Sequence, residues 1–169
     1  YEIFLQVVAH VKEDTVRIQE IATKVAAIDV LCAFARVSVE NNYVCPVIAD
    51  TPALEIVNGR HAVVELSCDY IPNDTLFVNN EIQVITGPNF AGKSCYMKQV
   101  ALLVILAQMG CCVPAAHARV GIVDRIFTRI GAYDDLVAGQ STFMVEMQET
   151  AQILHYATKD SLIILDEIG

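Results

Sequence analysis

A glycine-rich segment with one lysine and one serine carries the clearest chemical signal in the sequence. Gly87, Gly92, Lys93 and Ser94 match G-x-x-x-x-G-K-[ST], the pattern of phosphate-binding loops. In such a loop, backbone N–H groups surround an anion, and the following helix N-terminus adds partial positive charge. The lysine reaches the β- and γ-phosphates, and the serine hydroxyl lies on Mg²⁺. The pattern predicts a nucleoside triphosphate site formed by Gly87, Pro88, Asn89, Phe90, Ala91, Gly92, Lys93 and Ser94.

Two consecutive carboxylates near the end of the chain form the second chemical element. Asp166 and Glu167 follow directly after the apolar residues 162–165. A buried parallel strand would deliver both at its carboxyl end, where open α/β sheets bind their ligands. Asp166 would hold Mg²⁺, directly or through water, and Glu167 would polarise the attacking water as general base. Because an attacking water needs its own positioning group, paired acids favour hydrolysis over small-molecule kinase chemistry.

A small polar cluster, residues 139–143, is the third element. Ser141 or Thr142 can cap the helix that follows. The same cluster could instead be a second helix N-terminus facing an anion. A loop, a helix and then the Asp-Glu strand is the order found in ATPases of the ABC type, where the cluster contacts the nucleotide of a partner subunit. The residues alone leave both interpretations open.

The elements that must position these groups alternate between strands and helices. We expect strands at 47–48, 54–57, 61–65, 76–78, 82–85, 125–130 and 161–165, and a helix at 97–109. A second helix should follow residue 142 and bury one face, made of Phe143, Met147, Thr150, Leu154 and Ala157. This alternation predicts an α/β domain.

Residues 1–45 differ from the rest because they contain neither Gly nor Pro. One apolar seam recurs there at spacings of three and four: Ile18, Ile21, Val25, Ile28, Cys32 and Ala35. The pattern predicts one long helix, or two nearly collinear helices, ended by Asn41-Asn42 and Pro46. These helices could pack on the domain as an ordinary amphipathic pair, or act as a lever to a distant part. We place the domain boundary between 1–45 and 46–169.

Composition limits the class of protein and its partners. With 54% hydrophobic and 18% charged residues, the chain is globular. Its longest apolar run, 100–107, is too short for a bilayer, so we expect no membrane association. A net charge of −9 repels phosphate backbones, so this segment should not grip DNA over a broad face. We expect most of the six cysteines to be small buried side chains, which suits a reducing cytoplasm.

Three stretches together resemble the ATPase domain of the MutS family of DNA mismatch-repair proteins, most closely its bacterial members. They are TGPNFAGKSCYMKQ, VDRIFTRIGAYDDLVAGQSTFMVEM and LIILDEIG, and the similarity extends over essentially all 169 residues. The resemblance implies an ABC-type P-loop ATPase domain, with a mixed sheet flanked by helices, preceded by the end of long lever helices. It also implies that the chain is a fragment, truncated after the Asp-Glu strand. The intact protein would be a dimer that clamps DNA and couples mismatch sensing to ATP.

The resemblance also assigns roles to individual residues. It implies that Lys93 and Glu167 act in catalysis, and that Ser141 completes the site of the opposite subunit. Tyr70 would place its ring against adenine, with Ile71 beside it, while Asn89 would contact phosphate. His61 belongs to a Gly-Arg-His-Pro pattern in which Ala62 replaces the proline here, so we expect a histidine satisfied within the core.

Other functions predict other sequence features. An ATP-sensing, recombination-related member of the same family would bind ATP with little turnover, and Glu167 argues against it. A transporter nucleotide domain would carry LSGGQ, and a small GTPase would carry Asn-Lys-x-Asp; neither is present. We therefore expect ATP and Mg²⁺ as cofactors and a cytoplasmic homodimer. Its other partners would be mismatched double-stranded DNA, held by domains absent from this chain, and mismatch-repair proteins.

Overall fold

The computed structural model describes residues 1–78, 81–130 and 142–166. Helices and strands alternate through most of this length, after two helices at the start of the chain. In chain order the elements are α1 (Glu2–Glu13), α2 (Thr15–Glu40), β1 (Val47–Ala49), β2 (Ala53–Gly59), η1 (Val64–Leu66), β3 (Asn73–Val78), α3 (Lys93–Gln108), β4 (His117–Gly121), β5 (Ile126–Arg129), α4 (Thr142–Tyr156) and β6 (Leu162–Leu165).

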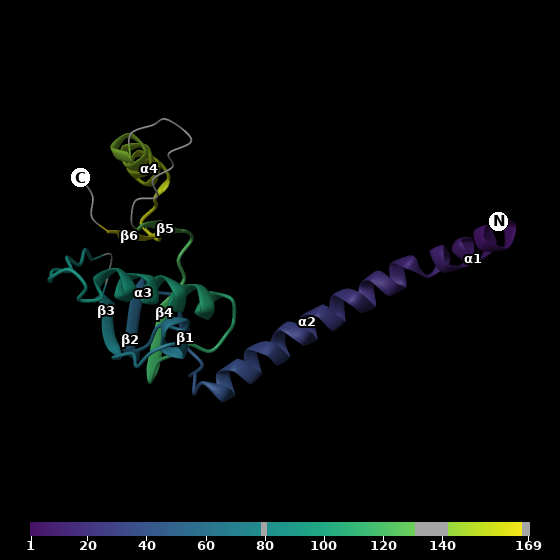
Figure 1. Cartoon of the computed structure of the whole chain (residues 1–169), viewed down its shortest axis with the longest axis horizontal. Helices are drawn as coiled ribbons and strands as arrows, with labels where there is room; N and C mark the ends of the chain where they lie inside the picture. Colours follow the sequence, from purple (N-terminus) through teal and green to yellow (C-terminus); the bar gives the residue numbers. More distant parts are fainter. Residues whose placement is uncertain (79–80, 131–141, 167–169) are drawn as a thin grey trace.

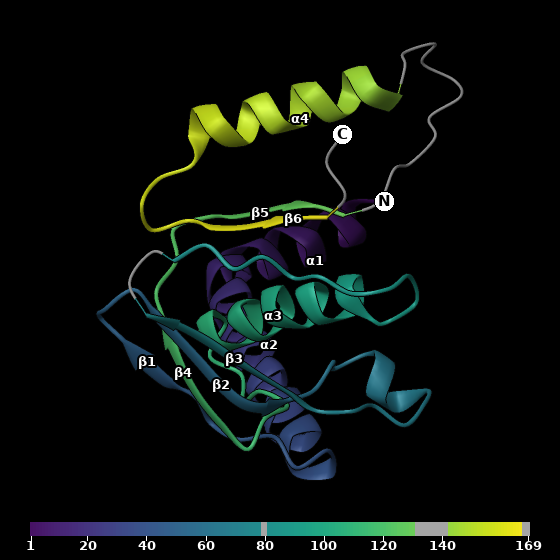
Figure 2. The same ribbon diagram turned by 90° about the vertical axis from the view of Figure 1, so that its left-hand side faces the viewer.

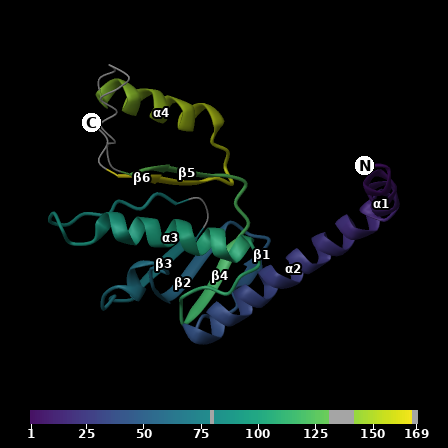
Figure 3. The same cartoon turned by 45° about the vertical axis from the view of Figure 1, so that its right-hand side comes forward.

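Helices α1 and α2 extend away from the rest of the molecule, as Figures 1 and 3 show. They meet at Asp14, where Figure 3 shows α1 turned out of the line of α2, so the region is helical as predicted but its two helices are not collinear. Their side chains are almost all exposed; Ser38, near the end of α2, is the buried exception. The predicted apolar seam is therefore uncovered in this part of the structure, with Ile21 and Ile28 more than half exposed. The helices do not pack on the domain as an ordinary amphipathic pair.

A four-stranded mixed sheet forms the base of the domain, in the order β1-β4-β2-β3. β1 runs parallel to β4, and β2 runs antiparallel to both β3 and β4. Helix α3 covers one face of this sheet (Figure 2). Ile56 and Val120 from the sheet and Leu103 and Val104 from α3 are at most 1% exposed and belong to one apolar cluster.

A second, smaller sheet pairs β5 with β6 in parallel, from Ile126 opposite Leu162 to Arg129 opposite Leu165. In all three ribbon views α3 lies between the four-stranded sheet and this pair, and α4 lies on the far side of the pair. The layers confirm the predicted α/β class with a mixed sheet and flanking helices. None of the helices in the described residues is long and apolar enough to cross a membrane.

The segment before the glycine-rich loop is not a strand, and the prediction for 82–85 is wrong in this structure. Residues 81–88 join no ladder, and the side chains of Ile82 and Val84 are 92% and 83% exposed. A cavity of about 740 Å³ is lined both by this segment and by β6. A β-branched run becomes a strand only through backbone hydrogen bonds to a neighbouring strand, and residues 81–85 pair with no strand in the described part of the chain.

Residues 61–65 are also not a strand, because the side chain of His61 takes up the local backbone donors. Its Nδ1 accepts hydrogen bonds from the N–H groups of Val63 and Val64, each at 3.3 Å. The carbonyl of His61 accepts the N–H of Glu65 at 3.0 Å. These local bonds compete with a ladder and turn the chain into the 3₁₀ turn η1.

Helix α4 packs through a face different from the predicted one. Phe143 and Leu154 are 58% and 79% exposed, whereas Ile153 is 7% exposed. Glu146, whose side chain is 12% exposed, lies on this inward face and pairs with Arg129 at the end of β5, whereas Glu149 pairs with the same arginine but stays 50% exposed. Apolar periodicity alone missed this face because one of its members is a carboxylate.

The cysteines are less buried than expected. Among the six free thiols, Cys111 is buried, Cys95 and Cys112 are half-buried, and Cys32, Cys45 and Cys68 are exposed. The expectation of mostly buried cysteines is therefore wrong.

Candidate nucleotide-binding site

The glycine-rich loop leads directly into α3, with Gly92 at the helix N-cap. Gly92 has φ +86°, in the left-handed region that glycine adopts without strain. Phe90 also has a positive φ, +65°. Its side chain is fully exposed, so the ring does not pack against the loop. The first N–H groups of α3 have no partners within the helix and are free to bind an anion.

Lys93 is folded back over its own loop. Its Nζ donates hydrogen bonds to the carbonyls of Gly87 at 3.0 Å and Pro88 at 3.2 Å. These two carbonyls hold the ammonium above the loop. A phosphate in the loop would offer the same ammonium a charged acceptor, and charge-assisted hydrogen bonds are stronger than those to neutral carbonyls.

The hydroxyl of Ser94 donates a hydrogen bond to Oδ2 of Asp166, although 72 residues separate them in sequence. Asp166 is 8% exposed, and its backbone N–H donates to the carbonyl of Arg129 at 2.8 Å. The β5–β6 pairing thus carries this carboxylate to the first turn of α3. Mg²⁺ prefers one or two protein oxygens together with phosphate oxygens, so this pair fits such an ion. In the described residues, no group of three or more His, Cys, Asp or Glu side chains could hold a metal by itself.

The sequence-predicted residues divide into those that the structure brings together and those that it does not describe. Lys93, Ser94 and Asp166 lie close around the start of α3, and Lys93 and Asp166 also line the 740 Å³ cavity. Ser141 and Glu167 fall outside the described residues. Their predicted roles in trans and as general base remain predictions.

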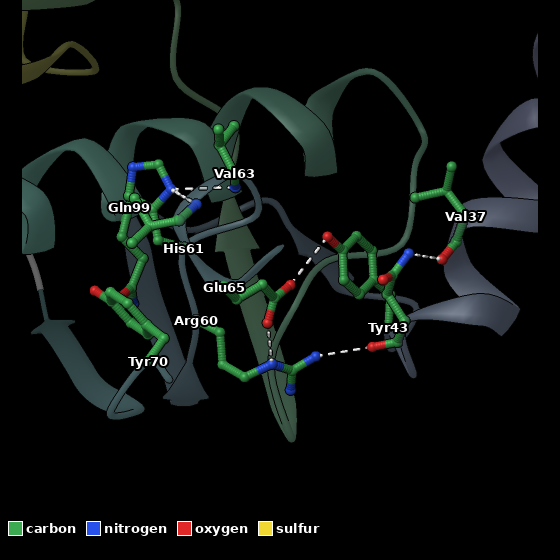
Figure 4. Close-up of polar contacts among 10 residues, drawn as sticks. Val37, Tyr43, Arg60, His61, Val63, Glu65, Tyr70 and Gln99 are labelled. Atoms are coloured by element: carbon green, nitrogen blue, oxygen red, sulfur yellow. Dashed lines mark hydrogen bonds and ion pairs between the residues drawn. The ribbon is translucent and has the colours of Figure 1, made fainter. Parts of the chain in front are cut away.

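Tyr70 lies beside the first turns of α3, as Figure 4 shows, where its hydroxyl donates to Oε1 of Gln99 at 2.7 Å. Burial is the main cause that raises the pKa of Tyr70 to about 12, so this hydroxyl stays protonated. The ring leans toward His61, with centroids 6.3 Å apart and planes at 59°. Ile71, next in the chain, is 81% exposed. The hydroxyl has a structural partner, which leaves the ring as the part that could contact a base.

Gln99 was not predicted, and it is a central polar residue of this region. It is fully buried on α3, and its Nε2 has no hydrogen-bond acceptor among the described residues. Gly59 approaches it so closely that a Cβ there would come within 2.5 Å of Nε2. Only the pairing of β2 with its neighbours reveals this approach, so sequence reasoning had no signal for it.

His61 is buried, as expected from the sequence, with 6% exposure. Its Nδ1 accepts hydrogen bonds from two backbone N–H groups at the start of η1, as Figure 4 shows for Val63. Burial lowers the pKa of His61, with a smaller contribution from the charge of Lys98. The residue is therefore a neutral, structural histidine.

A second polar cluster joins the end of α2 to the domain (Figure 4). Arg60 Nε donates to Glu65 at 2.6 Å, and its Nη2 donates to the carbonyl of Asn41 at 3.0 Å. Tyr43 donates its hydroxyl to the other oxygen of Glu65 at 3.1 Å. Sequence analysis missed this cluster, because its members come from two segments with no periodic relation.

Comparison with known proteins identifies the family. The family described as MutS domain V matches residues 83–169, the stretch that contains the loop, α3 and the end of β6. The chain belongs to the MutS family. Residues 83–169 are its domain V, the ABC-type P-loop ATPase domain of that family.

Individual MutS-family relatives match the whole chain. It is 53% identical over 174 residues to the DNA mismatch repair protein MutS of Caldicellulosiruptor saccharolyticus, covering 100% of this chain and 20% of that protein. It is 55% identical over 172 residues to the MutS of Caldanaerobacter subterraneus, with the same coverage. The MutS of Protochlamydia amoebophila is 54% identical over 173 residues, covering 99% of this chain and 20% of that protein. The chain thus spans about a fifth of the length of the curated relatives it matches.

Proposed function

We propose that this MutS-family chain binds ATP with Mg²⁺ in the loop Gly87–Ser94 and hydrolyses it, as the ATPase part of a DNA mismatch-repair clamp. The hydrogen bond between Ser94 and Asp166 carries the proposal. It joins the first turn of the loop helix to a buried carboxylate at the end of a parallel strand. A structural turn would not need a buried acid there, whereas a phosphate-binding site with a hard cation does.

Each predicted site residue has a defined role in this proposal. Lys93 transfers its hydrogen bonds from the carbonyls of Gly87 and Pro88 to the phosphates. Ser94 and Asp166 hold Mg²⁺, which when bound neutralises phosphate charge. Glu167 accepts a proton from the attacking water and orients it toward the terminal phosphate. Tyr70 offers its ring to adenine, beside Ile71, and Asn89 contacts phosphate.

The remaining tasks belong to the intact protein. We infer a cytoplasmic homodimer in which Ser141 of one subunit completes the site of the other. Mismatched double-stranded DNA and mismatch-repair proteins would bind through regions outside this chain, since its charge of −9 opposes DNA binding here. The relatives are named as DNA mismatch repair proteins, which favours this role over ATP sensing in recombination.

Replacement of the loop lysine tests the site. Lys93→Ala should abolish tight ATP binding in calorimetry and change the thermal midpoint very little, because the two hydrogen bonds it loses within the chain are exposed to solvent. Lys98→Ala is the matched control, since Lys98 is an exposed lysine on the same helix and lies away from the loop. Unchanged ATP affinity in a folded Lys93→Ala chain would refute the assignment.

The proposed base is tested separately. Glu167→Gln in the intact protein should retain ATP binding and lose steady-state phosphate release, because it removes the base and keeps the Asp166 contact. A normal hydrolysis rate in this variant would assign the base to another residue.

Subunit mixing tests the trans role of Ser141. Intact homodimers of Lys93→Ala and of Ser141→Ala should each be inactive. The two variants are then mixed, and exchange of differently tagged subunits is verified. In a trans arrangement, the mixed dimer has one site with both defects and one site in which Lys93 and Ser141 are both intact. Activity per dimer should then return to about half, if the two sites act independently. If activity does not recover after confirmed exchange, Ser141 acts only as a helix cap.

A further inference from the structure

Two cysteines lie opposite each other where the end of α2 meets the end of α3. Cys45 lies between α2 and β1, and Cys112 lies between α3 and β4. Their Sγ atoms are 2.6 Å apart, well inside van der Waals separation, and both thiols are free. The two residues are 67 positions apart in sequence, so the contact is tertiary.

The backbone register places the pair where a cross-strand link can form. Val44 and Val113 form an antiparallel bridge and exchange both hydrogen bonds, at 2.9 Å and 2.8 Å. Cys45 and Cys112 are the next residues outward, and therefore occupy a non-hydrogen-bonded position. Cα atoms in such pairs are typically about 4.5 Å apart, within the range of about 4.4–6.8 Å that disulfides span. Little backbone movement is needed to join the two sulfurs.

Accessibility separates this pair from the neighbouring thiol. Cys45 is exposed and Cys112 half-buried, so a small oxidant can reach them. Cys111 is 4% exposed and lies in the apolar interior. No cluster of three metal-ligating residues occurs here or elsewhere in the described ranges, which leaves thiol chemistry as the property of the pair.

We propose that Cys45 and Cys112 form a reversible disulfide that links the segment after α2 to the segment after α3. A thiolate of the pair attacks one sulfur of a small-molecule disulfide and releases one thiol. The second thiolate then attacks the mixed disulfide, so the Sγ–Sγ bond forms and a second thiol leaves. The pair loses two electrons and two protons, and both appear on the two thiols released.

Such a link has a mechanical consequence. α2 is the long projecting helix, and α3 is the helix that begins at the glycine-rich loop. A covalent bond between the segments that follow these two helices would restrict movement of α2 relative to α3. Disulfides in reducing compartments are usually transient or redox-sensing, which fits a pair of free thiols of which one is exposed and the other half-buried.

Oxidation with glutathione disulfide tests the proposal on the full chain. After alkylation of remaining thiols and digestion with trypsin, the expected product joins the peptide of residues 37–60 to that of 99–119. The second peptide contains both Cys111 and Cys112, so variants must separate them. Cys45→Ser and Cys112→Ser should each abolish the link, whereas Cys111→Ala should retain it. Cys68→Ser controls for an exposed cysteine elsewhere.

Thermal unfolding supplies the second readout. The oxidised chain should unfold on the order of 10 °C higher than the reduced chain, because the link closes a long loop, and a reducing agent should reverse the shift. The proposal fails if the pair stays reduced while other cysteines react, if the link survives Cys45→Ser, or if oxidation leaves the midpoint unchanged or lower. Cys45→Ser changes an exposed side chain, so it tests the proposal even if Cys112→Ser does not fold.

Discussion

Tyr70 has a hydroxyl that is bonded within the domain and a ring that we propose contacts adenine. Its hydroxyl is occupied by Gln99, which is fully buried. Its ring is free of that bond and lies beside the helix that begins at the glycine-rich loop. Substitution by Phe removes the hydroxyl alone, and substitution by Ala removes both the hydroxyl and the ring.

We predict that Tyr70→Phe and Tyr70→Ala will have different effects. Tyr70→Phe leaves Gln99 Oε1 without its donor and should lower the free energy of unfolding by about 1–3 kcal/mol, with ATP affinity retained. Tyr70→Ala should in addition weaken ATP binding by about 1–3 kcal/mol, because base stacking on the ring is lost. Denaturant titration and calorimetry measure the two quantities. Equal losses of affinity for ATP and for bare triphosphate would show that the ring does not contact the base.

His61 links the pH of the solution to the stability of this region. Burial lowers its pKa from the ordinary 6.5. Below that pH the unfolded chain takes up the proton before the folded chain does, so the unfolded state gains stability. The stabilising effect of neutral His61 is complete above pH 6.5 and is lost as the pH falls through its lowered pKa.

The free energy of unfolding should therefore decrease as the pH falls from about 7.5 to 5. His61→Asn keeps an acceptor for the N–H groups of Val63 and Val64 but cannot take up the proton, so its decrease should be smaller. The other three histidines are common to both proteins and cancel in the comparison. Urea titrations at each pH give the two slopes, and identical slopes would contradict the argument.

At the scale of elements, the end of α2 is held to the domain by a partly buried ion pair. The side chains of Arg60 and Glu65 are 23% and 14% exposed, and Glu65 also accepts the hydroxyl of Tyr43. Burial is the main cause that raises the pKa of Tyr43 to about 12, followed by the charge of Glu65. The three residues connect the segment after α2 to η1.

We predict that Glu65→Gln will destabilise the chain by about 2 kcal/mol, less than for a fully buried pair because both partners retain some solvent. The guanidinium of Arg60 would lose its charged partner. Glu40→Gln is the matched control, because the Arg36–Glu40 pair on α2 is exposed, and it should change stability very little. If both variants behave alike in chemical denaturation, the cluster does not hold α2 in place.

Several helices and strands could be predicted from the sequence. Long helices, the helix after the loop and the strand before Asp166 follow from periodicity and flanking residues, and they are present. The segment 82–85 and the face of α4 were mispredicted, because a strand requires a partner and because the inward face of α4 includes Glu146, which pairs with Arg129. The Ser94–Asp166 contact was expected from chemistry, whereas Gln99 and the Arg60–Glu65 cluster depend on packing that has no local pattern.

At the scale of the whole molecule, the chain combines a nucleotide-binding body with a long projecting helical arm (Figure 1). The apolar seam of the arm is exposed, and the polar cluster at its base touches the segment that carries Tyr70. Residues 60–70 therefore contact both the base of the arm, through Arg60 and Asn41, and α3, through Tyr70 and Gln99. This chain spans 20% of the length of relatives named as DNA mismatch repair proteins.

The dependence of ATP affinity on Mg²⁺ tests the central claim most directly. Calorimetry with a non-hydrolysable ATP analogue should give a dissociation constant several-fold lower with Mg²⁺ than with chelator in the unaltered chain. Asp166→Asn should bind the analogue without Mg²⁺ at least as well, because a negative charge near the phosphates is gone, and should show almost no gain from Mg²⁺. A folded Asp166→Asn chain that keeps the full Mg²⁺ gain would contradict the assignment of Ser94 and Asp166 to the ion.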